Sequence, residues 1–391
     1  MFLILYSCLL FFVCAVDSFT NFKYKKQMEW FVFGTTLLLM IIRFPAGMDT
    51  NDYIFRFKQI QGFFDTDHGT RNLGFAFLEY SVKTFTDDYR VFALIFNAIV
   101  NTLILSTIYK YSKQPLLSLC IYVMAGFYEV YSCSALRQGM AMAIFFFAFY
   151  RFLSRKQIIA YEICCLTAFL FHDAALISFF IPLLFPLGRM IKKNPKTALF
   201  VTVFIAVFAY SFLLFGFPKL LPLIQSLGFN HQFFAYMISF DISVIGILMQ
   251  LCFLFALLFL YFSSRSIEPG GEFESVQFYV VLGSIILYLV LSMYSQTSRM
   301  TDFYQIIMII LFADLFHGIT DRKRKALGFL GILALNSVLL LGDIQMTIAR
   351  VPDVNLKHYS LSGYPYMTVW NEDIHFFIDR AVDFRSANFA E

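Results

Sequence analysis

Apolar runs long enough to cross a lipid bilayer recur along almost the whole chain, and they constrain its fold more than any other feature. The first covers residues 2–19, and others cover 91–109, 242–262 and 275–294. A membrane-spanning helix needs roughly 20 mostly apolar residues. Only 14% of the 391 residues are charged, whereas soluble domains carry about 25%. The sequence therefore predicts a polytopic all-α protein, a helix bundle in a membrane.

The distribution of basic residues predicts how these spans are oriented. Lysine and arginine favour links on the cytoplasmic side, and they cluster just after 2–19, at the end of 134–153 and within 321–325. With those links inside, the chain makes about twelve crossings and has both termini outside. The expected single spans are 2–19, 29–45, 91–109, 115–132, 134–153, 197–215, 242–262, 275–294, 301–319 and 326–345.

The remaining apolar run, 157–187, is too long for one plain span and carries His172 and Asp173 in its middle. Both of its flanks are basic, so both ends are expected on the inner side. We therefore expect a re-entrant-like hairpin of two short helices, 158–171 and 174–187, with His172 at the outer turn. Each helix is about 21 Å long, less than the ~30 Å hydrocarbon core, so the turn needs protein or a water-filled cavity around it.

The same pattern sets the domain organisation. We expect one transmembrane domain at 1–348 and an extracytoplasmic tail at 349–391. The tail is polar, and its segment 371–385 is typical of a helix that lies on the outer surface. Within the domain, the outer loop 46–90 is expected to carry interfacial helices, because its segment 47–60 is amphipathic.

As a helix, the segment 47–60 places Asp49 and Asp52 on one face and Tyr53 and Phe57 on the neighbouring face. A helix of this kind lies flat at the level of the lipid headgroups. Asp49 stands at its start, where it is either a structural N-cap or a carboxylate that acts as a general base at the membrane surface.

Ionisable groups are scarce at the expected midplane and gather at the outer ends of spans. Such groups near hydrocarbon cost free energy, and by default they mark a functional site. Because pumps and coupled transporters usually keep them near the midplane, this pattern favours a reaction at the outer face, on a substrate with a polar head and a lipid tail. The candidate residues are Arg43, Asp49, Asp52, Tyr53, Glu129, Arg137, Gln138, His172 and Arg299.

Two arginines are candidate clamps for a diphosphate, because a planar guanidinium matches phosphate oxygens. Arg137 lies near the start of the span 134–153, and its structural alternative is a snorkelling side chain or a partner of Glu129. Arg299 lies at another outer span end, where its structural alternative is an interfacial anchor paired with Asp302.

Small residues recur every four positions beside Arg137, at Ala135, Gly139 and Ala143. This spacing places them on one face of a helix and predicts close packing against a neighbouring helix. We therefore expect Arg137 to point into protein rather than lipid.

His172 and Asp49 are the candidate general bases. A lone histidine in an apolar run is more often a packing residue, but His172 stands at an expected helix break beside an acidic residue, and we favour it on that ground. The sequence has no metal-binding motif, no glycine-rich phosphate loop and no nucleophile elbow. We expect no metal or cofactor, and no nucleic-acid partner, because the basic clusters follow the topology.

Six short segments follow one another along the chain: GMDTNDY at 47–53, NLGFAFLEY at 72–80, SALRQGMAMAI at 134–144, LTAFLFHDAALI at 166–177, SRMTDFY at 298–304 and YPY at 364–366. On these segments the chain resembles the EpsG family of bacterial exopolysaccharide and capsule polymerases, which are functionally akin to the Wzy polymerases.

The resemblance implies a multi-pass enzyme of the bacterial plasma membrane. It would join undecaprenyl-diphosphate-linked oligosaccharide repeat units into exopolysaccharide, capsule or O-antigen at the outer face, without a metal or a nucleotide sugar. The lipid bilayer, a flippase and a chain-length regulator are the partners that this implies. Arg137 and Arg299 would hold the diphosphate, and Asp49 or His172 would deprotonate the acceptor hydroxyl.

Two other classes of protein remain as alternatives. A polysaccharide or lipid transporter would show inverted repeats or charges at the midplane, and the sequence shows neither. A membrane acyltransferase that modifies a surface polysaccharide would use His172 and Asp173.

Overall fold

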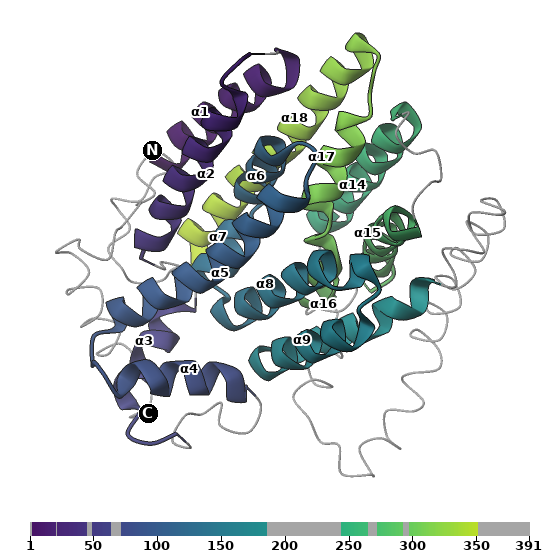
Figure 1. Cartoon of the computed structure of the whole chain (residues 1–391). Coiled ribbons are helices and arrows are strands. Elements are labelled where there is room, and N and C mark those ends of the chain that lie inside the picture. Colours follow the sequence, from purple (N-terminus) through teal and green to yellow (C-terminus); the bar gives the residue numbers. More distant parts are fainter. Residues whose placement is uncertain are drawn as a thin grey trace. The chain divides into compact units, whose positions relative to one another are not determined.

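The computed structural model describes residues 2–20, 22–44, 49–63, 72–185, 244–264, 272–291 and 297–350 (Figure 1). Every regular element in these ranges is helical, which confirms the predicted all-α class for this part of the chain. The predicted span at 197–215 and the predicted tail helix at 371–385 lie outside the described residues. The chain divides into two compact units, residues 1–176 with 330–391, and residues 177–329.

The first unit is built around α5 and α8. α5 packs against α2 and α8, α8 packs against α9, and α1 packs against α6. Its helices are α1 (Phe2–Phe19), α2 (Lys25–Ile42), α3 (Thr50–Gln59), α4 (Leu73–Lys83), α5 (Tyr89–Tyr111), α6 (Pro115–Met124), α7 (Phe127–Cys133), α8 (Leu136–Arg151), the short 3-10 helix η1 (Leu153–Arg155) and α9 (Ile158–Phe171). A second 3-10 helix, η2 (Asp173–Leu183), leads from this unit into the next.

The second unit contains α14 (Val244–Ser263), α15 (Glu272–Leu291), α16 (Thr297–Gln305), α17 (Met308–His317) and the start of α18 (Arg322–Arg350). α14 packs against α15 and α17, and α15 packs against α16. Two buried amides meet inside it, where Gln305 Nε2 donates to Gln250 Oε1 over 2.8 Å. This hydrogen bond satisfies polar groups that would otherwise be costly to bury between apolar helices.

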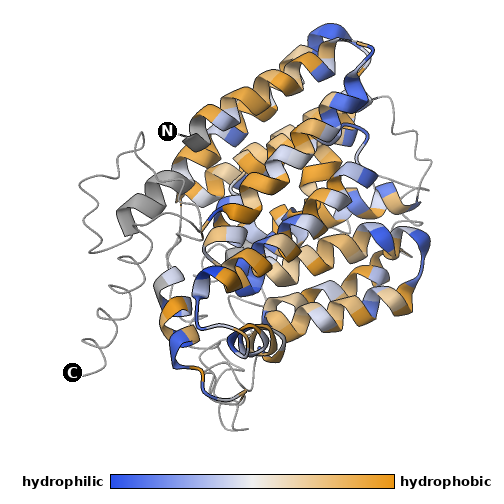
Figure 2. Ribbon diagram, turned by 60° about the vertical axis from the view of Figure 1, so that its left-hand side comes forward, coloured by the Kyte–Doolittle hydropathy of each residue, from blue (hydrophilic) through white to orange (hydrophobic). Residues whose placement is uncertain are grey.

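Among the described residues, five helices are long and apolar enough to cross a membrane, or six if α6 and α7 count as one bent span. The five are α5, α14, α15, α16 together with α17, and α18. Figure 2 shows that hydrophobic residues cover most of the long helices and that hydrophilic residues gather near helix ends. The chain is therefore a multi-pass membrane protein. The number of about twelve crossings and the position of both termini on the outer side remain predictions.

The span predicted at 115–132 is built from two helices rather than one. α6 and α7 meet at an angle of 65°. Gly126 stands between them with φ 81°, in the left-handed region that glycine adopts without a steric penalty. The expected span at 301–319 is likewise interrupted, because α16 ends at Gln305 and α17 begins at Met308.

The predicted break at His172 is confirmed. α9 ends at Phe171, and His172 has an extended backbone with φ −158° and ψ 130°. The second half, expected as an α-helix at 174–187, is instead the 3-10 helix η2, which contains Pro182. Proline has no N–H to donate and clashes with the carbonyl four residues earlier in an α-helix. The return of the chain to the inner side stays a prediction.

The predicted amphipathic helix at 47–60 is α3, and its predicted apolar residues Tyr53 and Phe57 are buried. They pack against protein, however, and not against lipid. The Phe57 ring centroid lies 5.6 Å from those of Tyr89 and Phe92 on α5. Aromatic pairs at such distances add to the stabilisation that comes from burial, so α3 is held on the end of α5.

Candidate functional site

A buried ion pair joins the end of α2 to the start of α7. Arg43 follows the last residue of α2, and Glu129 lies in the first turn of α7. Arg43 Nη1 donates to Glu129 Oε1, and Arg43 Nη2 donates to Glu129 Oε2 over 2.8 Å. The guanidinium also lies 5.2 Å from the ring centroid of Tyr128. With 1% and 6% of their surfaces exposed, Arg43 and Glu129 depend on each other for charge compensation.

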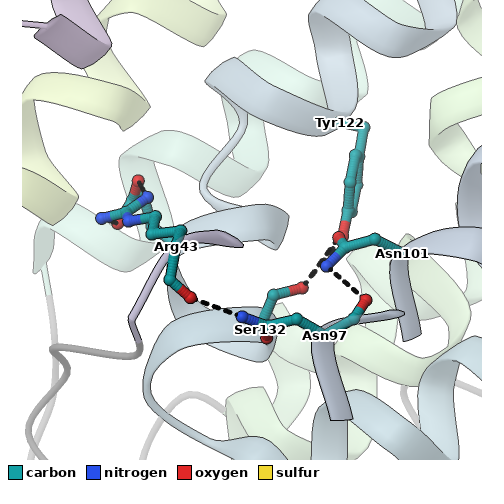
Figure 3. Close-up of polar contacts among 6 residues, drawn as sticks. Arg43, Asn97, Asn101, Tyr122 and Ser132 are labelled. Atoms are coloured by element: carbon teal, nitrogen blue, oxygen red, sulfur yellow. Dashed lines mark hydrogen bonds and ion pairs between the residues drawn. The ribbon is translucent and has the colours of Figure 1, made fainter. Parts of the chain in front are cut away.

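Figure 3 shows hydrogen bonds that continue from Arg43 into α5, α6 and α7. Asn97 Nδ2 donates to the backbone oxygen of Arg43 over 2.6 Å, and Asn101 Nδ2 donates to that of Asn97 over 3.0 Å. The Tyr122 hydroxyl donates to Asn101 Oδ1 over 3.2 Å and lies 3.1 Å from Ser132 Oγ. Because Tyr122 belongs to α6 and Ser132 to α7, these bonds hold both halves of the bent pair against α5.

We assign the Arg43–Glu129 pair a structural role at this bend. Its two parallel hydrogen bonds are the fork-to-fork arrangement that guanidinium and carboxylate groups prefer. Glu129, considered as a partner for Arg137 on sequence grounds, pairs with Arg43 instead. That either residue contacts substrate stays a prediction.

Removing one member of this pair leaves the other as a buried, uncompensated charge. We expect Arg43→Met and Glu129→Leu each to lower the free energy of unfolding by about 3–5 kcal/mol, and the double variant to lose less than the two single losses combined. Thermal unfolding of the purified protein in detergent measures this. Arg90→Met, which breaks the part-exposed pair with Asp88, serves as the control and should cost about 0–1 kcal/mol. Strictly additive losses would show that the pair is not coupled.

Gly139 brings the start of α8 directly against α7. A Cβ atom built on Gly139 would lie 1.7 Å from the backbone oxygen of Tyr131, so no other residue fits without moving a helix. The close packing predicted from the repeat of small residues is thereby confirmed at this position. The contact also fixes the first turn of α8, which carries Arg137 and Gln138.

Gln138 is buried, and its amide nitrogen lies 3.9 Å from Sδ of Met142 one turn further along α8. This places it inside the bundle beside Arg137, as expected for a residue of that turn. Its predicted contact with substrate stays a prediction.

Arg137 lies among groups that come from α3 and α4. It donates a hydrogen bond to the hydroxyl of Tyr53. Burial raises the pKa of Tyr53, and the nearby guanidinium partly offsets that shift. With the amide oxygen of Asn72 facing the guanidinium, Arg137 Nη1 donates to it over 3.0 Å, and the Asn72 amide nitrogen donates to the backbone oxygen of Phe171 over 2.9 Å. Asn72 therefore connects Arg137 to the residue before His172.

His172 lies at this same junction and is half-buried. Its Nδ1 accepts a hydrogen bond from the backbone N–H of Ala174 over 3.2 Å, at the start of η2. A neutral imidazole whose Nδ1 is an acceptor carries its proton on Nε2. In this arrangement the Nε2–H group of His172 is a hydrogen-bond donor, suited to an anion or a sugar oxygen.

Asp49 stands at the N-cap position of α3, yet its side chain makes no capping hydrogen bond. The carboxylate of Asp49 therefore does not cap α3, and it remains a candidate for a chemical role. The neighbouring Thr50 Oγ1 donates to the backbone oxygen of Cys133 over 3.4 Å, which ties the start of α3 to the end of α7. Asp52 lies in the first turn of α3 and is half-buried.

Arg299 belongs to the second unit, in the first turn of α16, and its side chain is exposed. Its predicted role as a second clamp on the diphosphate stays a prediction. In the described part of the chain, no group of three His, Cys, Asp or Glu side chains is arranged to hold a metal ion.

Two residues near Arg137, Asn72 and Glu79, had no role assigned to them from the sequence, although Glu79 is among the ionisable groups expected at the outer face and Asn72 begins the segment 72–80. Asn72 precedes α4, and Glu79 lies on the buried face of α4 with Phe75 and Val82. The signal for Glu79 was a carboxylate at a core position of a helical pattern, four residues after Phe75. The signal for Asn72 was weaker, because an asparagine before a helix is usually a cap.

The apolar helices, and a polar cluster built by α3, α4, α8 and the end of α9, define a multi-pass helical membrane protein with a candidate anion site on Arg137. The model of the EpsG family matches residues 28–347. The chain therefore belongs to the EpsG family, as the resemblance had predicted, and this membership indicates a role in polysaccharide biosynthesis. No curated protein and no solved structure matches the chain.

Proposed function

We propose that this protein is a polymerase of the bacterial plasma membrane, which joins undecaprenyl-diphosphate-linked oligosaccharide repeat units into a surface polysaccharide at the outer face. Membership of the EpsG family over most of the chain supports this class of function. The main structural support for the site is that Tyr53 and Asn72 hold the side chain of Arg137 at the junction of four helices.

The proposed reaction asks little covalent chemistry of the protein. In the donor, the bond between the anomeric carbon and the diphosphate oxygen breaks, and its electron pair leaves with the lipid diphosphate. The acceptor hydroxyl oxygen forms the new glycosidic bond and gives its proton to a base. The protein must therefore stabilise the departing diphosphate and place one base near the acceptor.

Arg137 is the proposed diphosphate ligand. A guanidinium has five N–H donors in a rigid fork, and its hydrogen bonds to Tyr53 and Asn72 fix the orientation of that fork. Asn72 also binds the backbone oxygen of Phe171, the residue before His172. Oriented donors stabilise developing charge without reorganising during the reaction.

Asp49 is the proposed base. Its carboxylate is not used to cap α3, and Tyr53 one turn later contacts Arg137. His172 was favoured on sequence grounds, but as a base it would need its Nδ1 protonated and its hydrogen bond from Ala174 broken. The acyltransferase alternative meets the same difficulty, because a carboxylate that orients a catalytic histidine accepts a hydrogen bond from its Nδ1–H group.

The clamp is tested with a substitution that keeps the charge. Arg137→Lys retains a cation but loses the planar fork, so we expect chain growth to fall by about 10–100-fold, the range for lost hydrogen bonds to a charged group. Surface polymer length in cells, with the protein level in the membrane as reference, is the measurement. The surface polymer should become as short as the single repeat units expected after deletion of the gene. Arg90→Lys, at the pair with Asp88, is the matched control. Polymer of normal length from Arg137→Lys would show that Arg137 is not the diphosphate ligand.

The two candidate bases differ in how the reaction depends on pH. A model imidazole titrates near pH ~6.5 and a model carboxyl near ~4. With Asp49 as the base, Asp49→Asn should be inactive at every pH, whereas His172→Gln should still turn over. With His172 as the base, turnover would instead fall as the pH drops through about 6, and His172→Gln would be the inactive variant. Purified protein and a lipid-linked repeat unit, assayed from pH 5 to 8, separate the two.

A further inference from the structure

Three links of the first unit bring exposed basic residues together at one end of that unit. The start of α2 lies beside the end of α5, because the ring centroids of Trp30 and Tyr109 are 5.1 Å apart. The end of α8 joins them, since the ring centroids of Tyr111 and Tyr150 are 5.9 Å apart. The exposed basic residues at this basic end of the unit are Lys23, Lys26, Lys110, Lys113, Arg155 and Lys156.

An exposed stripe runs along α2 and ends at Lys26. Its members Lys26, Trp30, Gly34 and Leu38 are four residues apart, so they lie on one face of the helix. Trp30 and Leu38 are 66% and 60% exposed, and a Cβ atom on Gly34 would meet no atom within 4 Å. In a multi-pass membrane protein, an exposed apolar stripe of this kind faces lipid.

Helices α5 and α9 repeat this arrangement. Exposed residues recur every three or four positions along α5 and end with a lysine: Val91, Ile95, Ile99, Thr102, Ser106 and Lys110. On α9, Ile159 and Ile163 are exposed, and Arg155 and Lys156 precede the helix. A long basic side chain at the end of an apolar stripe reaches toward the lipid headgroups. The three stripes therefore approach one level of the membrane from the same side.

Part of the positive charge at the basic end is already compensated. Lys25 Nζ lies 2.9 Å from Asp17 Oδ1, so we do not count Lys25 as part of the surface. Glu29 is buried and interacts with both Lys25 and Lys26. Lys110 Nζ lies 5.6 Å from the ring centroid of Tyr111, and an ammonium group held on a ring still has N–H groups to donate to an anion.

We propose that the basic end of the first unit binds the headgroups of anionic phospholipids, with their acyl chains along the exposed stripes of α2 and α5. A soluble acidic partner would match the charges alone. The apolar stripes that end at Lys26 and Lys110 fit a ligand with an anionic head and hydrocarbon chains. The exposed rings of Tyr24 and Trp30 are typical of residues at the level of the headgroups. This inference does not rest on the proposed reaction.

The fluorescence of Trp30 tests the inference with the full chain in bilayers. Acyl chains that carry bromine quench a tryptophan that they touch, so brominated phosphatidylglycerol is compared with brominated phosphatidylcholine at equal mole fraction. The other tryptophan is Trp370, and the quenching that remains in Trp30→Phe is therefore subtracted. We expect the anionic lipid to bind beside Trp30 at least about fivefold more tightly, the factor that corresponds to one basic residue near an anionic surface.

Two substitutions and a matched control locate the binding site. In the double variant Lys26→Gln with Lys110→Gln, the preference for phosphatidylglycerol should fall to about one, and each single variant should keep part of it. Lys58→Gln removes an exposed lysine from α3, which packs on the opposite end of α5 through Phe57 and Tyr89. This control should keep the full preference.

Equal binding of the two lipids, or an unchanged preference in the double variant, would overturn the inference. Quenching by neither lipid would show that the stripe of α2 does not face the bilayer, and would overturn it as well. Inorganic phosphate at constant ionic strength should leave the preference intact, and its loss would assign the basic end to a soluble phosphate instead. None of these outcomes decides the role of Arg137, which lies in the first turn of α8, whereas the basic end contains the last turn of that helix.

Discussion

The buried ion pair between Arg43 and Glu129 is the interaction on which the candidate site depends. It holds the end of α2 against the first turn of α7, in a helix pair that is bent by 65°. Gly139 of α8 packs so closely on the backbone oxygen of Tyr131 in α7 that no side chain fits at this position. The position of Arg137, two residues earlier, follows from that contact. The pair of Arg43 and Glu129 thus fixes α7, and α7 in turn positions the turn of α8 that carries Arg137.

Arg43 and Arg137 differ in their contacts, and this difference suggests how one chain separates structure from function. Arg43 is fully neutralised by Glu129, and the pair fixes a bend. Arg137 instead contacts the neutral groups of Tyr53 and Asn72. The planar guanidinium of Arg137 is suited to an anionic substrate, as the proposed polymerase reaction requires.

The sequence predicted those features that arise from periodicity and local chemistry. The amphipathic pattern of 47–60 gave α3, the polar pair at His172 gave the helix break, and the small-residue repeat around Gly139 gave close packing. Features that depend on tertiary partners were missed. The bend at Gly126 could not be predicted from the apolar run, because a glycine in the left-handed conformation does not change the periodicity of the hydrophobic residues.

The partners of the site residues were also beyond the sequence. Glu129 is near Arg137 along the chain, but it pairs with Arg43, 86 residues away. Asn72 was joined to Arg137 of α8 and to the backbone of Phe171 at the end of α9 only by the tertiary structure. Such choices depend on which helices pack together, and hydropathy alone does not determine that.

The central claim is that the site around Arg137 transfers glycan chains from a lipid diphosphate to an acceptor unit. Its most direct test uses purified protein in liposomes with an undecaprenyl-diphosphate-linked repeat unit as the sole added substrate, and counts released lipid diphosphate against new glycosidic bonds. The account predicts polymer with one lipid diphosphate released for each bond formed. Lipid-linked units that stay single and release no diphosphate, with correctly folded protein present, would contradict it.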